Sequence, residues 1–567
     1  MRSLLHSLLS KHVPWLALAL AFSAPAATYE VAQLNPRASD DGDGTSERPW
    51  KTIAKAAAQA RPGDTVVIRD GIYREQVVIR QNGTAQAPIV FQSAPGAQVV
   101  LTGADRLTRW RKSDGKRPVY QVLWTPRFIG WSTNMTHPDD AYHRLIGRCE
   151  QVVIDGYLLR QVLAADQLAP GTFFADVSNQ VLAVWDAGDR DLNNVLAEGS
   201  IRQEVLRVEG ANVQVRGLHF RYAANMAQHG AVVLAGAHDT LEDCTIEDMN
   251  SSGATFSAEH LVVRRCVFRD NGQLGFGANG AHDLLFSEGL VENNNTKGFG
   301  RGWEAGGDKL VLSRGAVLER SRFLRNRGTG IWFDIGNENC VVRQCLIADN
   351  EDGGIFDEIS YGLQAHDNVI IGNGFATTPG AWGAQAGISL SSSPESLIER
   401  NIIVGNREGF NFREQTRTTP RIGGQGEVPI WNHDETIRRN ILALNRDAQV
   451  WGWFDMADDR HWPAKDQSQP GGLTLETLRL YFVENVYFAD VGQGGFEWGV
   501  SWRRHKSYAT LPEFQTDLGM DHGGRTLNPA FANLSALDCR LSPQGTAALK
   551  QNYPEGPVPG VILGAQP

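Results

Sequence analysis

The chain has 567 residues and a formal net charge of −10, with 60 Gly and 15 Trp. This length accommodates one large repeat structure with attachments, or two to three ordinary domains. The acidic balance and the dispersed charges argue against a nucleic-acid-binding protein. Many glycines and aromatic residues are typical of a turn-rich β protein.

The first 26 residues have the layout of an export signal. Arg2 and Lys11 precede an apolar run over residues 15–22, and Ala24-Pro-Ala26 is a plausible signal-peptidase site. No later stretch is long enough to span a bilayer. We therefore predict a cleavable signal peptide over residues 1–26 and a periplasmic or secreted protein.

Residues 27–104 predict an N-terminal cap and the first strands. Residues 54–60 indicate a short helix, and Val/Ile-rich strands follow it over residues 63–79. A helix that leads directly into such strands would close the hydrophobic end of a stack. This opening resembles the N-terminal entry of pectate-lyase-like β-helix proteins.

Residues 105–200 interrupt the pattern. They contain Trp110 and Trp124 and two strand-like segments, 152–156 and 173–176. We predict an inserted β module here, placed where it can overhang the rest of the chain.

From residue 201 to 445 a short unit recurs. Each copy has a small or polar residue, an apolar stretch and, in most copies, an Asn five positions on; the copies begin at residues 244, 266, 321, 345, 368, 401 and 440. The shortest spacings, 22 to 24 residues, mean that one supersecondary unit is stacked repeatedly. Alternation of Val, Ile and Phe with polar residues indicates strands, and the fixed pattern of a leucine-rich repeat is missing. We predict an all-β, right-handed parallel β-helix.

Two residue types should line this β-helix in ladders. The recurring Asn would occupy one corner of every coil, adopt the left-handed backbone conformation and hydrogen-bond to the next coil. Cys244, Cys266 and Cys345 hold equivalent places and predict part of an inward ladder of small residues. Disulfides are the alternative for an exported chain with six cysteines.

After Asn445 the repeat fades. We predict that residues 446–567 form loops and a closing segment that packs back on the last coils, with 528–531 and 537–543 as its parts. Insertions at 105–200, 375–386 and 414–435 could wall off a groove and favour action on chain ends.

Two carboxylates occupy the same slot of successive copies. Asp334 ends Gly330-Ile-Trp-Phe-Asp334, and Glu358 ends Gly354-Ile-Phe-Asp-Glu358. Strand alternation predicts that Trp332 and Asp334 face solvent. Neighbouring strands lie about 4.7–4.9 Å apart, whereas retaining glycosidases need carboxyl groups about 5–5.5 Å apart and inverting ones about 6.5–9.5 Å. Simple stacking therefore predicts retention.

Carboxylates this close do not ionise independently. Repulsion raises the pKa of one of them, so that one serves as a protonated acid and the other as a nucleophilic anion. A solvated polar column, or a pair bridged by a cation, is the alternative. The expected substrate-binding residues around the pair are Trp303, Glu304, Lys309, Trp332, Asp357, Arg413 and His433.

Segments 330–334, 342–350 and 356–358 resemble the catalytic coils of glycoside hydrolase family 120, β-xylosidases with a β-helix core. The resemblance covers roughly residues 301–375 and implies that Asp334 is the nucleophile and Glu358 the acid/base. Ile359-Ser360 departs from the Val-Asn expected in that family, so a sister glycosidase family fits equally.

We therefore predict a glycosidase that acts on an oligo- or polysaccharide, without a cofactor or metal and with its oligomeric state open. The first alternative is a polysaccharide lyase or uronan epimerase. Its Ca²⁺ ligands would be Asp334, Asp357, Glu358 and Glu304, and its base Lys309 or Arg413. The second alternative is a non-catalytic carbohydrate-binding solenoid.

Overall fold

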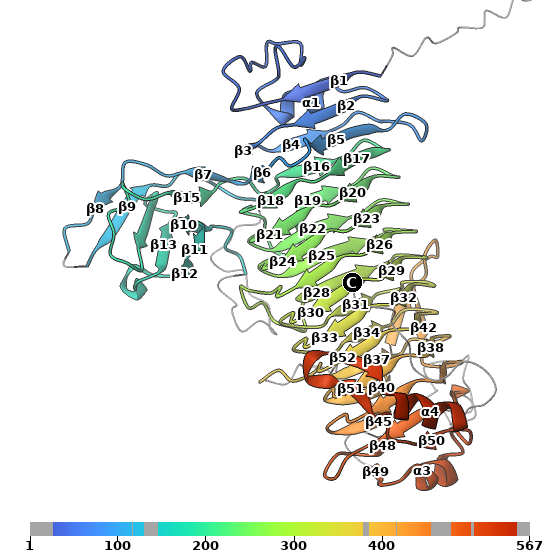
Figure 1. Ribbon diagram of the computed structural model, residues 1–567. Coiled ribbons are helices and arrows are strands. Elements are labelled where there is room, and N and C mark those ends of the chain that lie inside the picture. The colour runs from blue at the N-terminus through green and yellow to red at the C-terminus, as the bar shows by residue number, and fades with distance from the viewer. Residues whose placement is uncertain are drawn as a thin grey trace, which may run out of the picture.

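Three sheets of thirteen strands run the length of the molecule and wind around one axis (Figure 1). The computed structural model describes residues 26–115, 117–129, 146–377, 385–415, 417–454, 478–500 and 504–552. Each coil contributes one strand to each sheet, and apart from the last pair of the third sheet all neighbours are parallel. The prediction of an all-β parallel β-helix is confirmed.

Sheet I consists of β1 (Thr28–Val31), β2 (Thr65–Ile68), β5 (Ile89–Ser93), β17 (Val213–Arg216), β20 (Thr240–Glu242), β23 (Val262–Arg264), β26 (Leu285–Ser287), β29 (Val317–Glu319), β32 (Val341–Arg343), β35 (Gln364–His366), β38 (Leu397–Glu399), β43 (Thr436–Arg438) and β46 (Tyr481–Val483). Sheet II consists of β3 (Gly71–Tyr73), β6 (Val99–Thr102), β18 (His219–Arg221), β21 (Thr245–Glu247), β24 (Val267–Arg269), β27 (Leu290–Glu292), β30 (Arg322–Leu324), β33 (Leu346–Ala348), β36 (Val369–Ile371), β39 (Ile402–Val404), β44 (Ile441–Ala443), β47 (Val486–Phe488) and β50 (Arg525–Thr526).

Sheet III carries the candidate carboxylates. It consists of β4 (Val77–Ile79), β16 (Leu206–Val208), β19 (Gly230–Leu234), β22 (Ser252–Phe256), β25 (Leu274–Asn279), β28 (Gly306–Val311), β31 (Ile331–Asp334), β34 (Ile355–Glu358), β37 (Ala386–Ser391), β40 (Glu408–Glu414), β45 (Ala448–Phe454), β48 (Phe496–Val500) and β49 (Arg504–Tyr508).

The N-terminal end is closed by a helix, α1 (Ile53–Gln59). Thr52 caps it by accepting a hydrogen bond from the amide of Lys55. The Glu75 carboxylate accepts from the first two amides of the helix, which have no partner within it. Ile53 and Ala56 join the main core, so the helix covers the apolar end of the coils.

The inserted module projects from the side of the β-helix (Figure 1). Its smaller sheet contains β7 (Ala104–Arg106), β10 (Val152–Ile154), β11 (Tyr157–Leu158) and β15 (Ala197–Ser200). Its larger sheet contains β8 (Arg111–Lys112), β9 (Val119–Leu123), β12 (Arg160–Val162), β13 (Thr172–Asp176) and β14 (Val181–Trp185), and a 3-10 turn, η1 (Ala165–Gln167), precedes β13. Trp124, Phe173 and Leu182 belong to a core that the module forms for itself.

The recurring Asn builds a continuous ladder between sheets II and III. The side-chain NH2 donates to the next Asn Oδ1 at 2.9–3.0 Å through Asn271, Asn294, Asn326, Asn350 and Asn373. The left-handed residue is the one before the Asn, for example Asp349 with φ 57°. The predicted ladder is confirmed, but its Asn does not take the positive φ, because its amide must point inward along the stack.

Inside the coils, small and aromatic side chains stack. Cys244, Cys266 and Cys345 are buried at equivalent places, and all six cysteines are unpaired. Phe256, Phe268 and their successors form a chain of rings with centroids 4.9–6.3 Å apart. Stacking like on like lets each coil bury what it could not bury alone.

The C-terminal region covers the last coils. It includes α3 (Leu511–Leu518), β51 (Phe531–Asn533), η3 (Leu534–Ala536), β52 (Asp538–Leu541) and α4 (Pro543–Asn552). Cys539 and Leu549 pack on a hydrophobic cluster from the outer face of sheet II that includes Ile371 and Ile402. The closing segment therefore lies against the coils.

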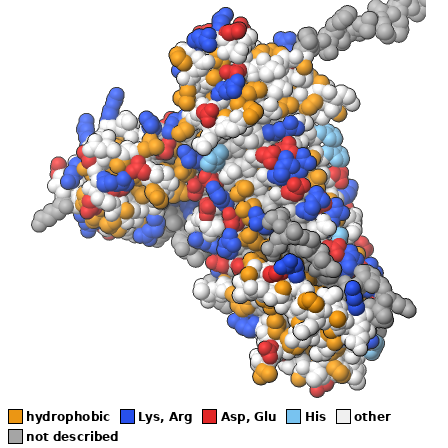
Figure 2. All heavy atoms as spheres, in the orientation of Figure 1, with side chains coloured by type: hydrophobic (Ala, Val, Ile, Leu, Met, Phe, Trp, Pro, Cys, Tyr) orange, Lys and Arg blue, Asp and Glu red, His pale blue; other side chains and the backbone are white. Residues whose placement is uncertain are grey.

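Acidic and basic side chains intermingle on the face shown in Figure 2. Many charged side chains form ion pairs between neighbouring coils, such as Arg343 with Glu319 at 2.5 Å.

No helix within the described ranges is long and apolar enough to cross a membrane. The predicted signal peptide lies outside the described residues except for Ala26, and it stays a prediction.

Candidate active site

The register of sheet III brings the two carboxylates together. β31 and β34 pair in parallel, with Trp332 opposite Phe356 and Phe333 opposite Asp357. Asp334 and Glu358 follow directly, each as the last residue of its strand. The 24-residue gap between them is therefore one full coil.

The outer face at this point is covered. Trp332 and Phe356 form a small cluster apart from the main core, with ring centroids 5.5 Å apart. Yet Trp332 is only 6% exposed and Asp334 and Glu358 are 7% exposed each. The expectation that Trp332 and Asp334 face solvent is thus wrong, because a loop over residues 293–305 and a hairpin over residues 417–430 extend over this part of the sheet.

A buried lysine pairs with Asp334. Lys309 Nζ lies 2.8 Å from Asp334 Oδ2, 3.4 Å from Glu304 Oε1 and 4.2 Å from the centroid of the Trp332 ring. Burial alone would lower the pKa of Lys309, but the charges of Asp334 and Glu304 outweigh it and raise that pKa. Lys309 therefore pairs as a cation with Asp334 in a buried site.

The second oxygen of Asp334 is unengaged. Among the described residues, the buried Oδ1 has no hydrogen-bond partner. Asp334 therefore has one oxygen oriented by a cation and one buried oxygen that accepts no hydrogen bond from a described residue.

Glu358 lies in a different environment. Burial and, next, the charge of Asp334 raise its pKa, and Arg417 and Arg413 oppose that shift. Arg417 Nη1 donates to Glu358 Oε1 at 2.5 Å. Burial and repulsion prevail over the two arginines, so the pKa of Glu358 lies above its usual range.

The hairpin that supplies Arg417 is fixed at its far end. It consists of β41 (Arg417–Pro420) and β42 (Glu427–Ile430). Arg421 donates to Glu338 at 2.8 Å and lies 4.0 Å from the centroid of the Tyr361 ring. A Cβ on Gly336, whose φ is 67°, would meet the Pro420 carbonyl oxygen at 2.3 Å, so only glycine permits this close approach.

The turns that follow the carboxylates are strained. Ile335 and Ile359, the next residues, have φ of 55° and 41°. A β-branched residue with positive φ is costly and persists only where its surroundings enforce it. Both side chains pack in a cluster with Tyr361 and Ile430, so the hairpin helps to enforce the backbone that presents the pair.

Asp357 does not join the site. It pairs with Phe333 and Leu390, two residues of the main core, and is 1% exposed. Its predicted substrate contact is wrong because strand alternation turns it inward while Glu358 turns outward. Burial raises its pKa well above the usual range.

The other expected contacts divide into two groups. Arg413 is fully buried two strands from Glu358 along the same column, which runs through Ser391. Trp303 belongs to the covering loop and lies 6.2 Å from Phe299, ring to ring.

His433 instead pairs with Asp434 at 2.8 Å and lies 5.0 Å from Trp431, at the turn after the hairpin. Glu304, Lys309, Trp332, Asp334 and Glu358 are brought together, with Arg413 behind them.

Sequence reasoning missed Arg417 and Gln415. Arg413 Nη2 donates to Gln415 Oε1 at 3.1 Å, and Arg417 Nη1 lies 3.4 Å from the same oxygen. The alternation Arg413, Gln415, Arg417 was the available signal, since alternate residues of an extended segment share one face.

Replacing Arg417 with methionine should shift the pH profile of activity. Without this cation the pKa of Glu358 rises further, so Glu358 keeps its proton to a higher pH. We expect the alkaline limb of kcat/KM to move up by about 1 unit or more. Arg417→Lys is the control and should move it less; an unchanged limb in Arg417→Met would contradict the pairing.

Replacing Asp357 with asparagine should stabilise the protein at high pH. The pKa of Asp357 is higher in the folded than in the unfolded protein. The free energy of unfolding is therefore unaffected below the unfolded-state pKa of about 3.9 and decreases as the pH rises from there toward the folded-state pKa. The loss is about 1.4 kcal/mol per pH unit in that window. Urea midpoints at pH 4 and pH 8 should show Asp357→Asn gaining on the parent as pH rises. The exposed Asp283→Asn should show no such trend.

The comparisons with known proteins agree with this architecture. The family model described as right handed beta helix region matches residues 184–306, 230–384 and 317–423. The chain is a right-handed parallel β-helix protein. A second model, chondroitinase B, matches residues 48–110 of this β-helix protein.

Individual relatives of this β-helix protein span most of its length or only a part. The uncharacterized protein YwoF of Bacillus subtilis is 22% identical over 529 residues, 91% of each chain. Pectate lyase PEL9 of Emericella nidulans is 34% identical over 83 residues, 14% of this chain and 20% of that protein. A solved structure described as XylC with xylose has a TM-score of 0.62 at 17% identity and covers 89% of this chain and 87% of its own. At that identity the likeness establishes the fold.

Proposed function

We propose that this protein is an exported glycoside hydrolase that cleaves an oligo- or polysaccharide with retention of anomeric configuration. One observation carries the proposal. Two carboxylates end adjacent parallel strands, Asp334 paired with the buried Lys309, and Glu358 with a pKa that burial and Asp334 raise in spite of its contact with Arg417. When two neighbouring carboxyl groups lie in different environments, one can serve as the acid/base and the other as the nucleophile.

In the first step the open oxygen of Asp334 attacks the anomeric carbon, and the bond to the leaving oxygen breaks. Glu358 gives its proton to that oxygen, so the aglycone leaves neutral. In the second step Glu358, now a carboxylate, takes a proton from water, whose oxygen displaces Asp334 from the anomeric carbon. Lys309, 2.8 Å from Asp334 Oδ2, orients the carboxylate for attack and stabilises its charge when it leaves. The proposed reaction uses no metal or cofactor.

The lyase alternative fits these residues less well. It needs Lys309 or Arg413 as a base, yet the pKa of Lys309 is raised, which leaves it protonated. Of the four carboxylates proposed for Ca²⁺, Asp357 faces the core. No three such side chains in the described part of the chain are grouped as metal ligands.

The substrate class is tested with a panel of aryl glycosides and polyuronates, with and without a chelator. The likeness to XylC, whose structure holds xylose, places aryl β-xylosides first in that panel. We expect release of the aryl group that is insensitive to chelator. Chelator-sensitive formation of unsaturated ends, seen by ultraviolet absorbance, would instead establish a lyase.

Stereochemistry provides a separate prediction. Adjacent strands about 4.8 Å apart suit the carboxyl spacing of retaining enzymes. Proton NMR of early hydrolysis should show the product anomer with the configuration of the substrate, before mutarotation. The opposite anomer would mean that water attacks directly and that Asp334 is a base.

A further inference from the structure

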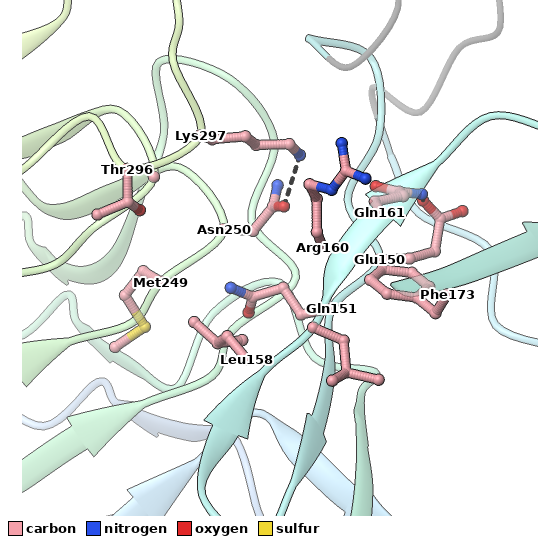
Figure 3. Close-up of a pocket in the computed structure, with 12 residues that line it drawn as sticks. Glu150, Gln151, Leu158, Arg160, Gln161, Phe173, Met249, Asn250, Thr296 and Lys297 are labelled. Atoms are coloured by element: carbon pink, nitrogen blue, oxygen red, sulfur yellow. Dashed lines mark hydrogen bonds between the residues drawn. The ribbon is translucent and has the colours of Figure 1, made fainter. Parts of the chain in front are cut away.

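A cavity lies between the inserted module and the β-helix (Figure 3). Its volume is about 440 Å³, within the range of small-molecule sites. The module contributes Glu150, Gln151, Leu158, Leu159, Arg160, Gln161 and Phe173, and the coils contribute Met249, Asn250, Gly272, Thr296 and Lys297. It lies outside the group of residues around Asp334 and Glu358.

The wall of this cavity combines apolar surface with a few oriented polar groups. Lys297 Nζ donates to the Arg148 carbonyl at 2.6 Å and to Asn250 Oδ1 at 2.7 Å, which fixes its charge at the edge of the coils (Figure 3). Gln161 Nε2 donates to Glu150 Oε2 at 3.0 Å, and the buried Gln161 Oε1 has no partner among the described residues. Such a surface offers both hydrogen bonds and apolar contact to a ligand.

The charge of the lining favours an anion. Lys297 and Arg160 are its two cations, and Glu150, its one carboxylate, already accepts from Gln161. The open Gln161 Oε1 is an acceptor and suits a hydroxyl donor. A ligand with one carboxylate and several hydroxyl groups matches all of these features.

One loop connects this cavity to the carboxylate pair. The loop over residues 293–305 carries Lys297 in its first half and Glu304 in its second. Lys297 Nζ lies 6.0 Å from the centroid of the Phe299 ring, which lies 6.2 Å from that of Trp303. Glu304 in turn contacts Lys309 at 3.4 Å, so both sites depend on the position of the same loop.

We propose that this cavity is a second saccharide site, which binds a sugar unit bearing a carboxylate, a uronate. Lys297 and Arg160 bind the carboxylate, Gln161 accepts from a hydroxyl group, and Leu158 and Met249 supply the apolar wall. The proposal rests on the proposed function in that both concern a saccharide, but the site is separate from the catalytic pair.

Binding is measured on the full-length protein by calorimetry and by ligand-observed NMR. The probes are D-glucuronate, D-galacturonate, neutral D-xylose and acetate. We expect a uronate to bind one equivalent at least 10-fold more tightly than xylose at this site, and acetate not to compete at equal concentration. Equal binding of uronate and xylose, or full competition by acetate, would overturn the proposal.

Variants locate the site. Arg160→Met and Lys297→Met should each weaken uronate binding 10-fold or more, and Arg160 is exposed, so its replacement leaves the fold intact. Arg111→Met, an exposed position on the same module, is the matched control and should bind as the parent does. Unchanged uronate binding in Arg160→Met and Lys297→Met would refute the assignment.

The Asp334→Ala variant separates this proposal from the hydrolase proposal. It should retain uronate binding while losing hydrolysis. Loss of binding in Asp334→Ala would mean that the uronate occupies the catalytic pair instead. If the substrate panel shows lyase activity, the reaction assigned to Asp334 changes. The proposed uronate site is still tested independently by the binding measurements.

Discussion

Asp334→Ala should abolish turnover of glycosides, with kcat reduced about 10⁴-fold or more, the scale seen when a covalent nucleophile is removed. Glu358→Ala should lose comparable activity on substrates with poor leaving groups but much less on activated aryl glycosides, which need no proton to depart. The measurement is steady-state kinetics on a pair of substrates that differ in leaving-group pKa. Glu288→Ala, on the outer surface of another coil, is the control and should match the parent.

Azide distinguishes the two roles. In Glu358→Ala azide can attack the glycosyl intermediate on Asp334, so activity should return and the glycosyl azide should retain the substrate's configuration. In Asp334→Ala azide can only replace the missing nucleophile, so any product should be inverted. Retained azide product from Asp334→Ala would reverse the assignment.

Lys309→Met should damage both activity and stability. Removing one partner of a buried ion pair leaves the other charge uncompensated, which costs about 3–5 kcal/mol in comparable cases. Asp334 also loses the contact that orients it, since Lys309 Nζ lies 2.8 Å from Asp334 Oδ2. We expect kcat/KM to fall about 10²- to 10³-fold at neutral pH, a loss typical of a removed electrostatic group.

Two measurements check this result. The urea midpoint of Lys309→Met should fall below that of the parent, because the ion pair between Lys309 Nζ and Asp334 Oδ2 is lost. Lys309→Arg preserves the charge and should recover part of the loss. If Lys309→Met kept the parental kcat/KM, the ion pair with Asp334 would have no part in the reaction.

The fold was predictable because a repeat converts sequence spacing into spatial position. The 24 residues between Asp334 and Glu358 equal one coil, so their adjacency follows from the period alone. The Asn ladder follows in the same way, since one polar corner recurs in every copy. The position of the residue with positive φ was predicted one residue too late in each coil. Many residue types, from Asp to Leu, take positive φ at that position, so no residue type identifies it.

The surroundings of the pair were less predictable. Arg417 reaches Glu358 from a hairpin 59 residues further along the chain, and no repeat spacing encodes where an insertion folds. The burial of Trp332 has the same origin. The inward position of Asp357, in contrast, was predictable from strand alternation. It was wrongly expected to contact substrate only because it carries a carboxyl group.

The coil spacing makes the distance between the two carboxylates discrete. Residues of one column are separated by whole multiples of about 4.8 Å, so a pair can lie on neighbouring coils or on coils that have one other coil between them, at roughly 10 Å. The first distance suits a glycosyl-enzyme intermediate and the second leaves room for a water molecule. Insertion of one whole coil between Asp334 and Glu358 would thus exchange one stereochemical course for the other without altering the architecture.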